Sequence, residues 1–193
     1  ITDQLRLATN FHSRVIGISQ KDRASILPAG HTANAAYWLD SQTGKFISST
    51  YYLPVLPGWV NSFNNLKLPD TYLSQAWSTL LPISTYTEST RDDASYETSL
   101  PGEKSPVCPH NLAAIRKKDY ELIRSTPFGN SLTKDFAIAC LKNEQLGKKG
   151  YTDFLTLSFS STDYIGHTFG PNSVEIEDTY LRLDKTIAEL LNY

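Results

Sequence analysis

The chain has 193 residues, with 18 Lys and Arg against 20 Asp and Glu, which gives a formal net charge of −2. Hydrophobic residues make up 40% and charged residues 20%, a composition that excludes disordered and low-complexity proteins. Because the charges nearly balance, no overall positive field attracts nucleic acid, and no apolar run is long enough to cross a membrane. The sequence predicts one globular domain in which any anion site is local.

A buried strand followed by a charged turn is predicted near the N-terminus. Residues 14–19 form a compact apolar run rich in β-branched side chains, which is typical of a strand covered by other elements. Lys21, Asp22 and Arg23 follow it directly, and residues 24–27 predict a short helix that the next Pro-Ala-Gly ends. Charged side chains are therefore expected at the carboxyl end of a buried strand.

A hairpin, a short helix and an irregular stretch are predicted next. Residues 35–39 and 45–49 flank the turn-like sequence DSQTG, a pattern that favours an antiparallel hairpin. Residues 57–63 begin Pro-Gly and carry aromatic and Val side chains that favour a short helix packed into the core. Residues 66–109 are rich in Pro, Ser, Thr and Tyr without sustained periodicity, so they predict an irregular insertion over the scaffold.

The last third of the chain predicts a helix, a strand, a loop and a second helix. The first helix is expected to be capped at residue 130 or 131 and to end near residue 146. Residues 154–159 are almost continuously apolar, which suits a strand covered on both faces in a parallel sheet. Residues 160–173 are predicted as the loop after it, and a cap at residue 172 or 173 starts an amphipathic helix. This order indicates an α/β fold.

Asp163 and His167 lie in this predicted loop, four residues apart. One helical turn or a tight loop would bring the carboxylate and the imidazole together, and both groups are suitable zinc ligands. A zinc site needs three or four ligands, and His12, His31 and His110 are scattered through the first 110 residues. Two interpretations stay open: half of a metal site, or a polar loop with a capping Asp and a hydrogen-bonded His.

Lys21 and Arg23 are the second candidate pair. Two cations two positions apart could bind a phosphoryl or sulfuryl group, the Arg by its planar fork and the Lys as a point charge. A solvated charged turn, in which Asp22 neutralises its neighbours, explains the same pattern. The sequence has neither of the glycine-rich nucleotide motifs, so a phosphate site here would not cradle a nucleotide in that way.

Cys108 and Cys140 lie far apart and match neither a structural zinc motif nor a thioredoxin-like motif. Cys140 falls on the apolar face of a predicted helix, which makes it a core residue. His110 follows Cys108 in a Pro-rich segment and is predicted to pack or to form hydrogen bonds.

Two stretches carry a family resemblance: GISQKDRASILPAGH at residues 17–31 and SFSSTDYIGHTFGPNS at residues 158–173, the latter continued by EIEDTYLRLD at residues 175–184. They resemble the alkaline phosphatase superfamily, specifically the phosphate-irrepressible alkaline phosphatases related to nucleotide pyrophosphatases and phosphodiesterases. The resemblance implies a three-layer α/β/α sandwich. Residues 1–193 would be the central part of one such catalytic domain.

The resemblance also implies two zinc ions beside a Thr or Ser nucleophile. Asp163 and His167 would be ligands of one zinc, and Lys21 and Arg23 would contact the phosphoryl oxygens. In the family the nucleophile and the first metal-binding Asp come before the part matched here, and the other Asp-His pair and the last His come after it. The chain also lacks Met, so we expect a piece of a longer enzyme, inactive alone and periplasmic or secreted in its whole form.

The leading hypothesis is zinc-dependent hydrolysis of small-molecule phosphate monoesters through a covalent phospho-enzyme. A phosphodiesterase or nucleotide pyrophosphatase of the same superfamily is one alternative, and a non-catalytic binding domain that has lost its metals is another. Lys21 and Arg23 are the residues that distinguish a monoesterase from a phosphodiesterase. The second substituent of a diester occupies the space where a monoester presents another charged oxygen to them.

Overall fold

Four strands form a mixed sheet in the order β3-β2-β1-β6. The central strand β1 (Val15–Ser19) runs parallel to β2 (Ala35–Asp40) on one side and to β6 (Phe154–Ser158) on the other. β2 also pairs with the antiparallel strand β3 (Lys45–Ile47). The predicted hairpin and the two predicted parallel strands are confirmed.

In the computed structural model, which describes residues 1–193, the chain divides into two units. The first unit comprises Ile1–Asp40, Gly44–Lys67 and Thr133–Phe159, and it contains the whole four-stranded sheet. The second unit comprises Ser41–Thr43, Leu68–Leu132 and Ser160–Tyr193.

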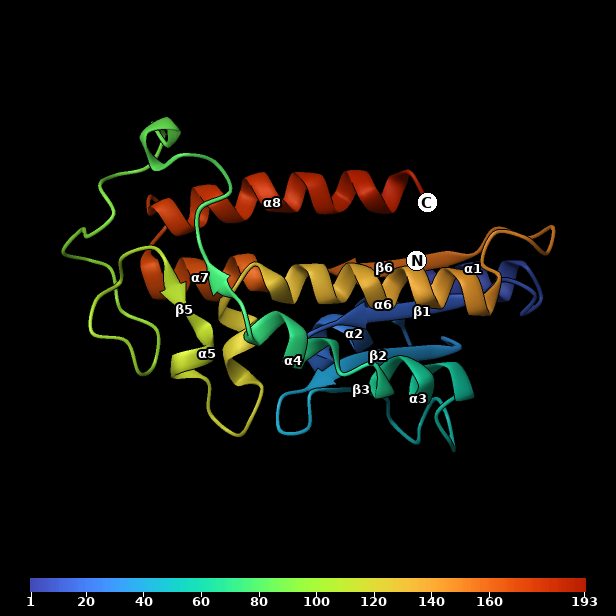
Figure 1. Cartoon of the computed structure of the whole chain (residues 1–193). Coiled ribbons are helices and arrows are strands. Elements are labelled where there is room, and N and C mark those ends of the chain that lie inside the picture. Colours follow the sequence, from blue (N-terminus) through green and yellow to red (C-terminus); the bar gives the residue numbers. More distant parts are fainter. The chain divides into compact units, whose positions relative to one another are not determined.

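Helices cover both faces of the sheet in the first unit (Figure 1). Gly17 of β1 faces α2 (Asp22–Ala29), and a Cβ atom at Gly17 would lie 2.2 Å from the Ser25 carbonyl oxygen of that helix. Tyr37 is on the opposite face, because it is in register with Ile18 rather than with Gly17, and its ring contacts Phe136. The helices of this unit are α1 (Thr2–Ala8), α2, α3 (Gly58–Asn65) and the part of α6 (Phe128–Glu144) from residue 133 onward. The predicted α/β/α layering is confirmed.

Aromatic side chains fill the layer between the sheet and the helices α3 and α6. The Phe136 ring stacks on Phe46 with a centroid distance of 3.9 Å and meets Tyr37 and Phe63 edge to face. All four rings are buried. Aromatic pairs contribute about 0.5–1.5 kcal/mol beyond the area they bury, so this cluster stabilises the first unit. The short helix predicted from residue 57 is confirmed as a core element.

Two predictions in the first unit were wrong, one about the burial of a strand and one about the length of a helix. β6 was expected to be covered on both faces, but its residues are partly exposed, including Phe154 at 38%. Within residues 1–193, β6 pairs with β1 alone. α2 begins at Asp22 and continues past Pro28 to Ala29, so it is longer than residues 24–27.

The second unit is built from short elements and two longer helices. Residues 66–109, predicted as irregular, contain α4 and two short elements, and no helix or strand lies between Thr85 and His110. The elements of this unit are α4 (Leu68–Leu73), β4 (Ala76–Trp77), the 3-10 helix η1 (Ile83–Thr85), β5 (His110–Asn111), α5 (Leu112–Ile115), the 3-10 helix η2 (Glu121–Ser125), α7 (Ser161–Phe169) and α8 (Val174–Leu191). None of the helices in the chain is both long and apolar enough to span a membrane.

The predicted loop at residues 160–173 is mostly the helix α7, so that prediction was wrong. Ile165 and Phe169, four residues apart, are fully buried, and this apolar stripe fixes the helix despite its polar sequence. Gly170 ends it with a φ of 88°, a conformation that favours glycine. The next helix, α8, is capped as predicted, because the Ser173 hydroxyl accepts a hydrogen bond from the Ile176 backbone N–H.

Candidate functional site

Lys21 and Arg23 stand at the N-terminus of α2, directly after β1. Lys21 is the residue that precedes the first turn, and its backbone N–H donates to the Ser19 hydroxyl oxygen over 3.1 Å. The Asp22 carboxylate accepts from the Arg23 backbone N–H at 2.6 Å. Arg23 is exposed and Lys21 is half-buried. The N-terminus of the helix carries partial positive charge, so it adds to the charges of Lys21 and Arg23, with Asp22 as the one carboxylate in this turn.

Asp163 and His167 lie one turn apart on α7. The His167 Nε2 atom is 3.3 Å from Asp163 Oδ1, and the side chains are 80% and 55% exposed. One helical turn therefore brings the two groups together, as their spacing predicted. At a tetrahedral zinc ion, ligand bonds of about 2.0–2.1 Å place two ligand atoms roughly 3.3 Å apart. The residue types and their separation both fit half of a zinc site.

Asn130 holds the start of α7, a role that the sequence did not predict. Its Oδ1 atom accepts from the Ser161 backbone N–H at 3.2 Å, and its Nδ2 atom donates to the Thr162 hydroxyl at 3.3 Å. Asn130 was expected to cap its own helix, but α6 begins earlier, at Phe128 after Pro127. The Asn130 side chain lies within α6, past its first residue, and bonds to the first turn of α7, the helix that carries Asp163 and His167.

An open pocket of about 210 Å³ lies beside Asp163 and His167 in the second unit. Its walls come from α7, from Pro171 in the turn after α7, and from Ile176 and Tyr180 in the first half of α8. The imidazole and the carboxylate are thus accessible from a hollow whose other walls are partly apolar. Lys21 and Arg23 belong to the first unit, and Asp163 and His167 belong to the second.

A buried polar cluster in the second unit also escaped prediction. Cys108 Sγ, His110 and a Glu175 carboxylate oxygen lie within 4.8 Å of one another. His110 was predicted to form hydrogen bonds, and this is confirmed: Nδ1 is 2.8 Å from Glu103 Oε2 and Nε2 is 3.4 Å from Glu175 Oε1. No spacing rule links Glu175 to residues far earlier in the chain, so only the fold shows the cluster. Cys140 is buried in α6, as predicted.

Burial and neighbouring carboxylates shift the pKa values in this cluster. Burial and then Glu175 raise the pKa of Asp92 to about 7. The same two causes raise the pKa of the Cys108 thiol and that of Glu97. Burial lowers the pKa of His110, but its hydrogen bonds to Glu175 and Glu103 outweigh burial, so the net pKa is raised. The local field is therefore negative and attracts a proton or a cation.

The family model for type I phosphodiesterase / nucleotide pyrophosphatase matches residues 6–193. The chain belongs to this family. It is 60% identical to a protein of Myroides odoratus named calcium-transporting ATPase and 56% identical to the alkaline phosphatase PhoV of Synechococcus elongatus. Both matches cover 100% of this chain but only 36% and 35% of the relatives, so the chain spans about a third of their length.

Solved structures agree with this assignment. The crystal structure of the alkaline phosphatase PafA matches with a TM-score of 0.96 and 54% identity over 99% of this chain and 37% of that one. A second structure is a PafA variant in which a Thr, an Asn, a Lys and an Arg are substituted, with a TM-score of 0.96 and 53% identity over 99% of this chain and 37% of that one. The predicted resemblance to the alkaline phosphatase superfamily is confirmed, together with the mixed α/β fold.

Proposed function

We propose that the whole protein hydrolyses small-molecule phosphate monoesters with the help of zinc, through a covalent phospho-enzyme. The observation that carries the proposal is the match to PafA, an alkaline phosphatase, at 54% identity and a TM-score of 0.96. PhoV, at 56% identity, bears the same activity in its name. Since the chain spans about a third of these enzymes, the nucleophile is assigned to a part of the protein outside residues 1–193.

Lys21 and Arg23 are proposed to bind the transferring phosphoryl group. The guanidinium of Arg23 can donate two parallel hydrogen bonds to non-bridging oxygens, and the Lys21 ammonium supplies a point charge. The N-terminus of α2 favours the same anion. The PafA variant supports this role, because its substituted Lys and Arg are two positions apart, as Lys21 and Arg23 are. Together these groups would neutralise charge that is concentrated on the phosphoryl oxygens in the transition state.

Asp163 and His167 are proposed as two ligands of one zinc ion. Their separation of 3.3 Å, their exposure and their oxygen and nitrogen donors fit that metal. Zinc would lower the pKa of the nucleophile and stabilise the leaving oxygen. Asn130 would orient the pair by fixing the first turn of α7. The other ligands and a second zinc are assigned to the remainder of the protein.

Two alternatives remain to be tested against the monoesterase. The family description names phosphodiesterases and nucleotide pyrophosphatases, whose substrates are diesters or anhydrides. A binding domain without metal would retain the fold and lose the chemistry. The monoesterase is favoured because the solved structures, which match 99% of this chain, are those of an alkaline phosphatase.

The experiment is a paired assay of the full-length protein. An aryl phosphate and its methyl aryl diester share one chromogenic leaving group, so the two rates are directly comparable. We expect kcat/KM to be higher for the monoester, to fall after dialysis against a chelator and to return with zinc. A higher kcat/KM for the diester would favour the phosphodiesterase, and no turnover of either substrate by zinc-loaded protein would favour the binding domain.

We extend the proposal to a periplasmic or secreted location and to the absence of a nucleic-acid partner. The small net charge of −2 supports the second point. Fractionation of cells by osmotic shock tests the first, since an intracellular protein would remain with the cytoplasmic fraction.

A further inference from the structure

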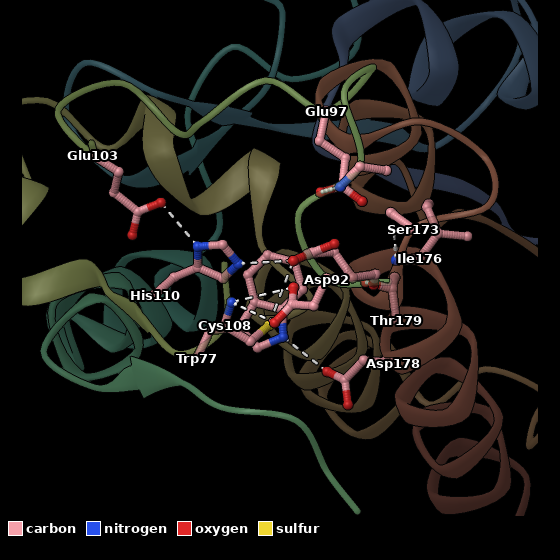
Figure 2. A network of polar contacts seen from close by, with 12 residues as sticks. Trp77, Asp92, Glu97, Glu103, Cys108, His110, Ser173, Ile176, Asp178 and Thr179 are labelled. Atoms are coloured by element: carbon pink, nitrogen blue, oxygen red, sulfur yellow. Dashed lines mark hydrogen bonds and ion pairs between the residues drawn. The ribbon is translucent and has the colours of Figure 1, made fainter. Parts of the chain in front are cut away.

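The buried cluster of Cys108, His110 and Glu175 contains side chains that metals bind, and it uses neither Asp163 nor His167. The side chains of His110 and Glu175 are fully buried, whereas Cys108 is half-buried. Figure 2 shows the imidazole of His110 with Glu103 on one side and with Cys108 and Asp92 on the other. The rings of Trp77 and Phe169 pack against the imidazole at centroid distances of 4.9 and 5.1 Å. The cluster therefore has an apolar wall and one accessible sulfur.

One carboxylate oxygen in the cluster lacks a hydrogen-bond partner. Glu175 Oε1 is near His110 Nε2 and accepts from the Cys108 thiol, but Oε2 is buried and accepts from no N–H, thiol or hydroxyl group. The carboxyl group of Asp92 is beside Glu175 and can hydrogen-bond it only when one of the two is protonated. A buried polar atom without a partner is expensive, and a buried charge is more so. Asp92 lies against Glu175 and brings a second carboxylate to the same place. His110 is the one basic side chain here, and it faces three carboxyl groups, those of Glu103, Asp92 and Glu175, so the cluster carries more negative than positive charge.

The separations in the cluster match the edges of a zinc tetrahedron. His110 Nε2 is 3.4 Å and Cys108 Sγ is 3.5 Å from Glu175 Oε1. Zinc bonds of about 2.0–2.1 Å to nitrogen and oxygen and about 2.3 Å to sulfur give edges of roughly 3.3 Å and 3.5 Å. The remaining edge, between His110 and Cys108 Sγ, is at most 4.8 Å, and its contraction to roughly 3.5 Å would complete one face of the tetrahedron.

Glu103 and Asp92 are two further carboxylates next to the proposed ligands, one hydrogen-bonded to His110 and one to the backbone of Cys108. Glu103 Oε2 is 2.8 Å from His110 Nδ1, so it would accept a hydrogen bond from Nδ1–H and fix the tautomer in which Nε2 can bind a metal. The Asp92 carboxylate accepts from the Cys108 backbone N–H at 3.1 Å and lies against Glu175, just outside the three ligand atoms that are within 4.8 Å of one another, so a side-chain rotation would bring it in as a fourth ligand. One thiolate, one imidazole and two carboxylates form a donor set that suits zinc better than magnesium or calcium.

We propose that Cys108, His110 and Glu175, with Asp92 as the fourth ligand, form a structural zinc site. Binding replaces the Cys108 S–H proton with a sulfur–zinc bond, and that proton leaves to solvent. The metal would link residues 92–110 to α8. Residues 92–109 contain no helix or strand, and His110 begins β5. Four protein ligands leave no open position, which is the pattern of structural rather than catalytic zinc.

Cobalt substitution in the full-length protein tests the proposal without relying on activity. After dialysis against a chelator, Co²⁺ is added and the near-ultraviolet band of cobalt–thiolate charge transfer is measured. The proposed ligands Asp163 and His167 contain no sulfur, so we expect the band in wild type and in Cys140→Ser, but not in Cys108→Ser. Zinc should abolish the band by displacing cobalt. A wild-type protein without the band, or a band that survives in Cys108→Ser, overturns the proposal.

Glu175→Gln separates a metal site from a simple hydrogen-bond cluster. Glutamine keeps the size and one acceptor oxygen, but removes the charge and the second ligand oxygen. We expect Glu175→Gln to bind one equivalent of zinc less than wild type and Glu103→Gln to bind that zinc about 10- to 100-fold more weakly. If only hydrogen bonds matter, Glu175→Gln keeps the wild-type zinc content. That result would overturn the proposal, even if Cys108→Ser does not fold.

Discussion

Glu175 and Asp178 are three residues apart on α8, and both side chains are fully buried, yet only Asp178 has a complete set of partners. Asp178 accepts hydrogen bonds from the Trp77 indole N–H, the Leu80 backbone N–H, the Tyr86 hydroxyl and Arg182 Nε, at 2.6–2.8 Å. Glu175 Oε2 accepts none. Asp178 therefore acts as a structural anchor, a carboxylate held by four hydrogen bonds, whereas Glu175 is the carboxylate that we propose as a zinc ligand.

Substitution of the anchor should destabilise the second unit. In Asp178→Asn the amide N–H₂ group would face Trp77 and Arg182, which are donors themselves, so two contacts are lost and a cation is left unpaired. We expect the free energy of unfolding to fall by about 2–4 kcal/mol. Asp184→Asn, an exposed position on the same helix, should change it by less than about 0.5 kcal/mol. Urea unfolding followed by Trp fluorescence gives the free energy of unfolding of both variants. Equally small changes in the two would contradict the anchoring role of Asp178.

Gly17 should tolerate no side chain, because α2 approaches the sheet at this point. The new Cβ atom of Gly17→Ala would meet the Ser25 carbonyl oxygen at 2.2 Å and Ala29 Cβ at 2.9 Å, so the helix must move. Overpacking of this kind costs about 1–3 kcal/mol. Gly58→Ala is the matched control, since nothing lies within 4 Å of its added Cβ atom and Ala favours a helix. Thermal unfolding should show a lower Tm for the first variant and an unchanged or higher Tm for the second.

Asp3 should make stability depend on pH in the acid range. Hydrogen bonds from the backbone N–H and the hydroxyl of Thr32 lower its pKa from 3.8 to about 2. A carboxyl with a depressed pKa in the folded state stabilises the protein above its ordinary pKa, and the effect is lost as the pH falls to about 2. Asp3→Asn should therefore be less stable than wild type at neutral pH, and the difference should shrink as the pH falls below 3.8 and vanish below about pH 2. Urea unfolding midpoints of both proteins, measured between pH 2 and pH 7, test this prediction. A difference in midpoint that does not change with pH would show that the Asp3 charge does not contribute to stability.

The sequence predicted the elements whose pattern is local and failed where distant residues decide. The apolar run at β1, the hairpin and the cap at Ser173 depend on neighbours in the chain, so periodicity and turn chemistry identify them. α7 was mistaken for a loop because its polar sequence hides two apolar positions, Ile165 and Phe169, which only burial reveals. The apolar run of β6 correctly predicted a strand, but which of its residues are covered depends on elements that are distant in the chain.

The candidate site was predictable to a similar extent. The spacing of Asp163 and His167 on one helical turn correctly indicated that the two groups meet. Their chemical roles, and those of Lys21 and Arg23, came from the family resemblance and stay predictions. The Cys108, His110 and Glu175 cluster was missed because it joins residues 67 positions apart, and Glu175 looked like an ordinary acidic residue in the first turn of a helix.

Loss of either proposed zinc ligand on α7 should remove metal and activity together. In full-length Asp163→Ala and His167→Ala we expect about one equivalent of zinc less than wild type and a fall in kcat of more than about 100-fold, because the charge on which the mechanism depends is lost. Glu177→Gln, on α8, is a control with a carboxylate outside the proposed ligands. Zinc content by mass spectrometry and activity with an aryl phosphate are measured on the same samples. Wild-type values for both in either variant would remove that residue from the site.

Lys21 and Arg23 should matter more for a monoester than for a diester. A monoester dianion carries one more charge on its non-bridging oxygens, so each cation that contacts these oxygens stabilises its transition state more strongly. Loss of one such contact costs about 2–4 kcal/mol, which is roughly 30- to 1000-fold in rate. In full-length Lys21→Ala and Arg23→Ala, kcat/KM for an aryl phosphate should fall by this factor, and kcat/KM for the matched methyl aryl diester should fall much less.

The ratio of the two losses decides between phosphate contacts and a solvated charged turn. If the turn only carries surface charge, both variants lose little on either substrate, as a charge reversal such as Lys45→Glu in β3 should. If the protein is a phosphodiesterase, we expect equal losses on the two substrates, because Lys21 and Arg23 would then contact only the one negative charge that monoester and diester share. Only a loss that is at least about tenfold larger for the monoester, a difference of about 1.4 kcal/mol, supports Lys21 and Arg23 as monoester-binding residues.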